Sequence, residues 1–139
     1  MKTTAKLIKV IVVDDHDVFR SGLKFILKRF SNIEIIAEAC NGEEFIEICR
    51  HKTPDIVFMD VKMPVMGGLE ATQYCSKYWP EIKIIALTMF KERIYVMNLI
   101  EAGAKGILFK ESFSNELDQA INTVSKGEVY YSNIVNTVL

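Results

Sequence analysis

The sequence predicts an α/β fold in which a doubly wound, five-stranded parallel sheet lies between two layers of helices. Five short apolar runs of strand length alternate with segments of helical spacing. The runs are nearly continuous in Ile and Val, which is typical of strands buried on both faces. The length of 139 residues fits one domain, and 50% hydrophobic with 25% charged residues excludes a disordered, fibrous or coiled-coil chain.

Each expected element follows from the local pattern. The strands are expected at residues 8–13, 33–37, 56–59, 82–87 and 106–109. Apolar residues at i, i+4, i+7 and i+8 predict amphipathic helices over 19–30 and 113–124. Asn41, with Glu44 three residues on, is expected to cap a second helix. Weaker helical patterns cover 68–79 and 91–102, and the apolar residues Ile134, Val135, Val138 and Leu139 fit either another helix or a packed linker.

Charge and cysteine usage restrict the class of protein. The net charge of −1 gives no reason for the chain itself to bind nucleic acid or an anionic membrane. No export signal is visible after Met1, and no apolar run approaches the roughly 20 residues that span a bilayer. Cys40, Cys49 and Cys75 form no CxxC pair, so we expect reduced cysteines in a cytoplasmic protein.

Polar residues follow four of the expected strands directly. Asp14 and Asp15 follow the first strand, Asp60 the third, Thr88 the fourth and Lys110 the fifth. Because the carboxyl ends of parallel strands meet at one edge, where doubly wound folds bind ligands, these side chains are expected to converge. Each alone is more often a turn, capping or solvated residue, so the prediction rests on their joint placement.

The predicted cluster is suited to phosphoryl chemistry. Three carboxylates repel one another, and a hard divalent cation relieves that repulsion, with Mg²⁺ the usual choice where phosphate is handled. Lys110 and Thr88 can bind phosphoryl oxygens, and Asp60 is the predicted nucleophile because it ends the central strand of the three. His16 is left outside the metal site, because a lone His at a helix start is more often a packing or hydrogen-bonding residue.

The loop after Asp60 contains Met-Pro at 63–64 and Gly-Gly at 67–68. Proline stiffens such a loop, and glycines permit left-handed turns or close backbone approach. The backbone carbonyl of Lys62 is a further candidate metal ligand. An ordinary strand-to-helix loop explains the glycines equally well.

Four strings follow one another in the chain: VVDDHDVFRSGL at 12–23, DIVFMDVKMPVMGG at 55–68, IIALT at 84–88 and GAKGILFK at 103–110. In this order and spacing, over about residues 7–126, they resemble the receiver domains of bacterial two-component response regulators, particularly those of the NarL/LuxR type. The resemblance implies the flavodoxin-like fold of CheY, with strand order 2-1-3-4-5.

The resemblance also implies a phosphorelay function. Asp60 would accept a phosphoryl group from a phosphohistidine of a sensor histidine kinase, and Thr88 and Lys110 would bind that group. The ligands of Mg²⁺ would be Asp15, Asp60, the Lys62 carbonyl and, through water, Asp14. The domain would not be an enzyme acting on other substrates, since it would promote only its own phosphorylation and dephosphorylation.

Signal output is expected to depart from the family at one position. Receivers of this family commonly carry an aromatic residue three before the lysine, which turns inward on activation, but this chain has Ile107 there. The resemblance implies that residues 1–126 form the receiver domain and that 127–139 begin a linker to an absent C-terminal helix-turn-helix domain. DNA would be bound only through that domain, and phosphorylation would favour a homodimer.

Other functions fit the residues less well. A haloacid-dehalogenase phosphatase requires Asp-x-Asp, whereas Val61 and Lys62 follow Asp60. A flavodoxin-like cofactor domain requires a Gly-, Ser- or Thr-rich loop after the first strand, where the acidic pair lies. A pseudo-receiver acting by protein interaction would not need the intact acidic cluster. A stand-alone receiver, which acts without an output domain, is the alternative that the residues leave open.

Overall fold

The computed structural model describes residues 7–138, except for the side chains of residues 134, 136 and 138. The expectation that no export signal follows Met1 concerns residues 1–6, which lie outside the described residues. The expected packing of the Ile134, Val138 and Leu139 side chains lies outside them as well. Within the described range, no helix is long and apolar enough to cross a bilayer.

Strands and helices alternate along the chain as the apolar pattern predicts. The strands are β1 (Ile8–Val13), β2 (Ile33–Ala39), β3 (Ile56–Asp60), β4 (Lys83–Thr88), β5 (Gly106–Phe109) and β6 (Tyr130–Tyr131). The helices are α1 (Asp17–Leu27), α2 (Gly42–Cys49), α3 (Gly68–Tyr78), α4 (Arg93–Ala102), α5 (Leu117–Ser125) and α6 (Asn133–Val138), with a 3₁₀ turn η1 (Phe113–Asn115) before α5.

The sheet has the order β2-β1-β3-β4-β5-β6, and every neighbouring pair is parallel. The predicted order 2-1-3-4-5 is confirmed, but the expected number of five strands missed β6. This strand pairs with β5, where Tyr130 N donates to Lys105 O and Ser132 N donates to Ile107 O, both at 2.9 Å. Two residues are too few to show an apolar period, so sequence pattern does not reveal such a strand.

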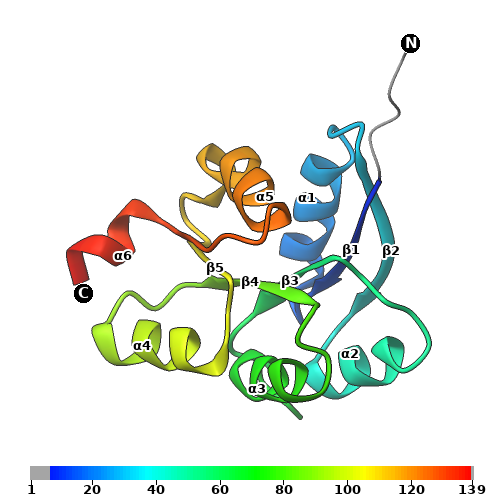
Figure 1. Cartoon of the computed structure of the whole chain (residues 1–139), viewed down its shortest axis with the longest axis horizontal. Helices are drawn as coiled ribbons and strands as arrows, with labels where there is room; N and C mark the ends of the chain where they lie inside the picture. The colour runs from blue at the N-terminus through cyan, green and yellow to red at the C-terminus, as the bar shows by residue number, and fades with distance from the viewer. Residues whose placement is uncertain (1–6, 139) are drawn as a thin grey trace.

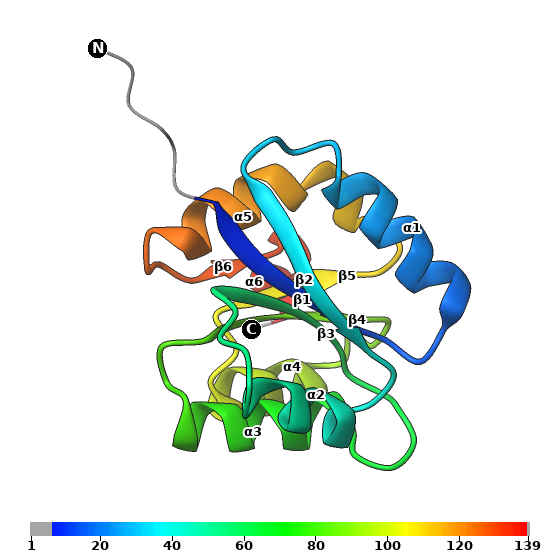
Figure 2. The ribbon, with the colours of Figure 1, turned by 90° about the vertical axis from the view of Figure 1, so that its right-hand side faces the viewer.

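Helices cover both faces of the sheet, as Figures 1 and 2 show: α1 and α5 lie on one face, and α2, α3 and α4 lie on the other. The α1 and α5 face packs Leu23, Leu27, Leu117 and Ile121 on strand residues such as Val12 and Phe58. The opposite face packs helix residues such as Phe45 and Cys75 on Ile11, Val57 and Met59. Neighbouring strand residues thus point into different cores, which explains the nearly continuous apolar runs.

The helix ends refine the predicted boundaries. The side chain of Asn41 accepts a hydrogen bond from Glu44 N at 2.8 Å, which confirms the predicted cap of α2. Glu44 in turn accepts from Cys40 N at 2.8 Å, so two free backbone N–H groups gain partners. The expected helix over 113–124 is interrupted, because Phe113 lies in η1 and α5 begins only at Leu117.

Candidate functional site

The ends of β1 and β3 lie side by side and bring the acidic residues together. Val13 pairs with Met59, so Asp14 and Asp60 follow at the same level of the sheet. Asp14 is 1% exposed and Asp60 is 5% exposed, whereas the side chain of Asp15 is 26% exposed. Two carboxylates are therefore buried, and the third lies at the mouth of the site.

Lys110 reaches the two buried carboxylates from the end of β5. Its Nζ lies 2.9 Å from Asp14 Oδ2 and 3.1 Å from Asp60 Oδ1. The Lys110 side chain is only 10% exposed. The structure thus brings together Asp14, Asp60 and Lys110, which are separated by up to 96 positions in sequence.

Thr88 lies at the same edge, buried at the end of β4. Its carbonyl accepts a hydrogen bond from Lys110 N at 2.9 Å, which ties the ends of β4 and β5 together. Its Oγ1 accepts from Phe90 N at 2.9 Å. The hydroxyl therefore stabilises the turn that leads toward α4, which is a local role. The sequence predicts that Thr88 lies at the same edge as Lys110, and the structure places it there.

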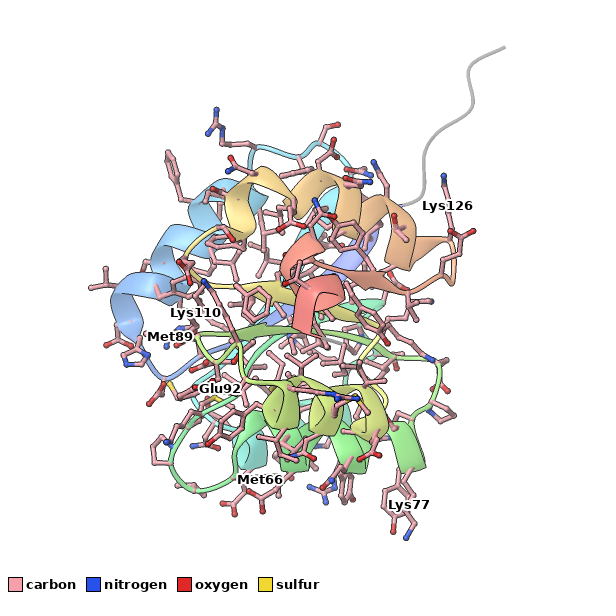
Figure 3. The ribbon with its side chains drawn as sticks, turned by 90° about the vertical axis from the view of Figure 1, so that its left-hand side faces the viewer. Met66, Lys77, Met89, Glu92, Lys110 and Lys126 are labelled. Atoms are coloured by element: carbon pink, nitrogen blue, oxygen red, sulfur yellow. The ribbon has the colours of Figure 1, made fainter. Side chains whose placement is uncertain are left out.

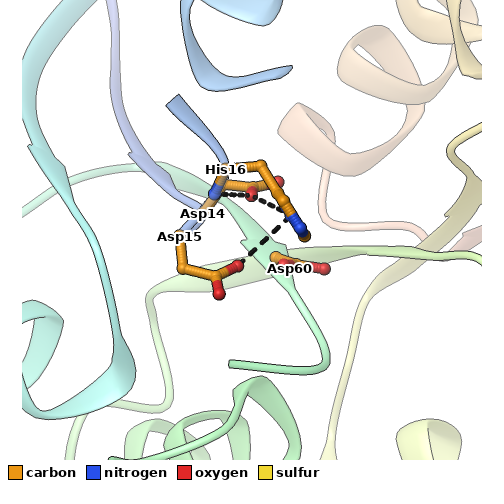
Figure 4. Close-up of side chains that lie close together, drawn as sticks. All are labelled: Asp14, Asp15, His16 and Asp60. Carbon is orange, nitrogen blue, oxygen red and sulfur yellow. Dashed lines mark hydrogen bonds and ion pairs between the residues drawn. The ribbon is translucent and has the colours of Figure 1, made fainter. Parts of the chain in front are cut away.

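His16 approaches the acidic pair, although the sequence argument left it outside the site. Its Nδ1 lies 3.4 Å from Asp14 Oδ1 and 3.3 Å from Asp15 Oδ1, and its backbone N donates to Asp14 Oδ1 at 2.8 Å. Figure 4 shows this group beside Asp60, and ligand atoms of all four residues lie within 4.8 Å of one another. With its side chain 66% exposed, His16 forms the rim of the cluster.

The electrostatics of the cluster suit a cation. Burial raises the pKa of Asp60 from 3.8 to about 6, and the Asp14 carboxylate adds to the rise, while Lys110 opposes it. Asp60 Oδ2 is buried and accepts no hydrogen bond from the described residues. Three carboxylates face one ammonium, so a hard cation bound through oxygen would offset the excess charge and satisfy this atom. The acidic cluster can therefore bind a metal ion.

The loop that follows Asp60 depends on one glycine. A Cβ at Gly68 would lie 2.0 Å from the Asp60 carbonyl oxygen, closer than atoms can approach. Gly68 N also donates to Val61 O at 2.7 Å, closing the loop tightly. The left-handed residue of this loop is Val65, with φ of 75°, rather than either glycine. Close backbone approach therefore explains Gly68.

Ile107 is fully buried in β5 and packs among residues of α4 and the C-terminal segment. Its strand partner is Tyr131, and Val135 of α6 lies buried in the same core. The segment after residue 127 thus covers the position at which receivers of the resembling family commonly carry an aromatic residue and this chain carries Ile107. Periodicity gave no signal for this contact, because β6 is only two residues long.

Two residues of α1 contact the site without having been predicted to do so. Arg20 Nη1 donates to the Asp14 carbonyl at 2.6 Å, and the Phe19 ring lies beneath Lys110 Nζ, 4.4 Å from its centroid. The helical spacing of residues 19–30 predicts for Phe19 only a core-facing position. The available signal was its place in the first turn of the helix that follows the acidic pair.

A shallow groove of about 520 Å³ opens over this edge, and its walls are largely apolar. In Figure 3, Met89 and Lys110 lie together at one end of the molecule, with Lys126 at the other end. The groove borders Lys110, which contacts the buried carboxylates of Asp14 and Asp60. It is lined by His16, Val18, Phe19, Met89, Lys110 and Glu111.

The family profile of the response regulator receiver domain matches residues 10–122. This chain belongs to that family. It is 41% identical over 126 residues to the response regulator GacA of Pseudomonas syringae pv. syringae and 37% identical over 127 residues to the response regulator UvrY of Escherichia coli K12. Both alignments cover 91% of this chain but only 59% and 58% of the relatives. The receiver chain therefore spans about three fifths of the length of these relatives.

Solved structures agree with this membership. The two-component response regulator of the LuxR family from Aurantimonas sp. SI85-9A1 matches with a TM-score of 0.89 at 32% identity, covering 95% of this chain and 94% of that one. The isolated receiver domain of RcsB from Salmonella enterica serovar Typhimurium has the same TM-score, and the match covers 96% of this chain and 99% of that one. Because the two sequences are only 21% identical, this match supports the fold alone. This chain is a receiver domain of a two-component response regulator, similar to those of the NarL/LuxR type.

Proposed function

We propose that this receiver domain accepts a phosphoryl group on Asp60 from a phosphohistidine of a sensor histidine kinase. The observation that supports it is the buried Asp60 carboxylate, which is held by Lys110 through Oδ1 and whose Oδ2 accepts no hydrogen bond from the described part of the chain. Family membership favours the same site, because the residues around Asp60 lie within the matched segment. The phosphoryl transfer would take place in the cytoplasm.

In the proposed transfer, a carboxylate oxygen of Asp60 forms a bond to phosphorus as the bond from phosphorus to the imidazole nitrogen breaks. The electron pair of the broken bond goes to the departing imidazole, which takes up a proton. Lys110 would turn from Asp60 Oδ1 to a phosphoryl oxygen, and the Thr88 hydroxyl would leave Phe90 N to donate to another. Both movements would transmit the new charge to the ends of β4 and β5.

The acidic residues would hold Mg²⁺ through oxygen. The proposed ligands are Asp15, Asp60, the Lys62 carbonyl and, through water, Asp14, with His16 at the rim of the cluster. Bound there, the ion would supply positive charge that offsets the negative charge of the carboxylates and of the phosphoryl group. The unpartnered Asp60 Oδ2 and the excess of carboxylates in the cluster support this assignment.

We propose that residues 1–126 form the receiver domain and that 127–139 lead into a C-terminal output domain. The greater length of GacA and UvrY supports this division, although β6 within 127–139 also extends the sheet. One RcsB structure contains two dimers bound to two parallel DNAs. By analogy, phosphorylation would favour a homodimer, and DNA would be bound only through the output domain.

The test is phosphorylation by a small donor. Incubation of the 139-residue chain with acetyl phosphate and Mg²⁺ should add one phosphoryl mass, seen by intact-protein mass spectrometry, and EDTA should prevent it. Asp60→Asn should abolish the adduct, whereas Asp17→Asn should not, because Asp17 is an 85% exposed carboxylate at the start of α1. The absence of an adduct in the wild-type chain, under conditions that phosphorylate a known receiver, would refute the proposal. Steady hydrolysis of small phosphate esters would favour a phosphatase instead.

A further inference from the structure

The ammonium of Lys110 rests on the face of an aromatic ring. Its Nζ lies 4.4 Å from the centroid of Phe19, well within the distance at which a cation is attracted by a ring face. We propose that Phe19 is a positioning residue for Lys110, which holds the ammonium beside Asp60 during phosphoryl transfer. This inference rests on the proposed function of Asp60.

The surroundings of Lys110 leave the ammonium a defined position. Asp14 Oδ2 and Asp60 Oδ1 bind it at 2.9 and 3.1 Å, and the ring of Phe19 forms a third neighbour. The Lys110 side chain is 10% exposed, so little water competes with these partners. A cation–π contact is stronger in such a desolvated place than at an open surface.

Phe19 is itself held by the fold. Its ring packs against Phe113 with centroids 5.4 Å apart and planes at 59°. Phe113 begins η1 three residues after Lys110, and both rings pack against the core beneath α1 and α5. The ring is therefore tied to α1 and to the segment that carries Lys110, so it can hold the ammonium in place.

This arrangement matters because the contacts of Lys110 change during transfer. As Asp60 becomes an acyl phosphate, the carboxylate charge on Oδ1 is lost, and the ammonium must turn to a phosphoryl oxygen. The ring is neutral and keeps its attraction for the ammonium before and after that exchange. Loss of the ring should therefore lower the maximal rate of phosphorylation more than it changes the donor concentration at half-saturation.

The test compares Phe19→Leu with two further variants. Phe19→Tyr keeps a ring face and should restore the wild-type rate. Phe30→Leu removes a ring that packs against the same core. Among the described residues, this ring makes no cation–π contact with Lys110. With acetyl phosphate and Mg²⁺, the maximal rate for Phe19→Leu should fall by about 3- to 10-fold, as expected for losing one partly desolvated cation–π contact.

A spectroscopic measurement tests the contact without phosphorylation. In the wild-type chain the ring current of Phe19 should shift the Lys110 side-chain proton signals upfield, and Phe19→Leu should remove that shift. Lys110 signals at ordinary positions in the wild type would overturn the proposal, even if Phe19→Leu fails to fold.

The outcomes separate the two proposals. If the wild-type chain takes up no phosphoryl group, the assignment of Asp60 fails. If the wild type is phosphorylated and Phe19→Leu matches its rate, the role of Phe19 fails while that of Asp60 stands. Equal losses in Phe19→Leu and Phe30→Leu would show a packing effect and would also overturn the role of Phe19.

Discussion

Replacement of the buried Asp60 carboxylate by a neutral amide should stabilise the metal-free domain at neutral pH. Asp60 is 5% exposed, and its pKa is raised to about 6, chiefly by burial and also by Asp14. The native state therefore destabilises the charged form of Asp60 relative to the unfolded chain. Asp60→Asn removes that charge and keeps nearly the same shape.

The magnitude follows from the pKa shift. From 3.8 to about 6 is a rise of about two units, which corresponds to about 3 kcal/mol. Because the folded-state pKa of this acid is raised, the folded state binds the proton more tightly, so stability falls as pH rises from about 4 to about 6. Asp60→Asn should thus be up to about 3 kcal/mol more stable than the wild type at pH 7. The difference should approach zero only as the pH falls below the unfolded-state pKa of 3.8, where Asp60 becomes protonated in both states.

Urea unfolding of both proteins, in EDTA and between pH 4 and pH 7.5, measures this difference directly. Groups far from Asp60 also titrate over this range, but they do so in both proteins and cancel in the comparison. Asp17→Asn serves as the control, because Asp17 is exposed at the start of α1. A loss of stability in Asp60→Asn at pH 7, or a difference that does not vary with pH, would refute the reasoning.

Three further predictions concern the loop, the tail and the cap. Gly68→Ala should lower the free energy of unfolding by about 2–3 kcal/mol in chemical denaturation, because its Cβ would meet the Asp60 carbonyl at 2.0 Å; an unchanged midpoint would contradict this close approach. Glu116→Ala removes the carboxylate that accepts hydrogen bonds from the hydroxyls of Tyr130 and Ser132 at 2.7 and 2.8 Å, and it should speed amide hydrogen exchange in β6 roughly tenfold. Unchanged exchange would show that other contacts hold the tail. Asn41→Ala should cost about 1 kcal/mol in thermal unfolding, and Asn41→Asp, which retains the cap acceptor, should lose much less.

The fold was largely predictable because its strands are buried on both faces. Runs such as 8–13 and 56–59 therefore contain few polar residues, and each is recognisable by itself. Strand order came from the resemblance rather than from the runs, since apolar content does not say which strands are neighbours. The segment of β6 carries no such run, because a strand of two residues leaves no pattern to detect.

The candidate site was predictable to the extent that it follows from topology. Asp14, Asp60 and Lys110 meet because parallel strands end at one edge, and their positions after apolar runs are visible in the sequence. The approach of His16 and the ring of Phe19 was missed, because it depends on how the first turn of α1 is placed over that edge. Side-chain direction within a turn is set by packing, which spacing alone does not specify.

The sequence by itself determined the alternating α/β architecture and the five polar residues at the strand ends. Both are local consequences of burial and of chain direction. Only the tertiary structure decided which atoms interact: the Lys110 bridge between two carboxylates, the Thr88 hydroxyl on Phe90 N, and the tail over Ile107. The Lys110 bridge and the tail over Ile107 join segments distant in sequence, and their geometry depends on the packing of whole helices against the sheet.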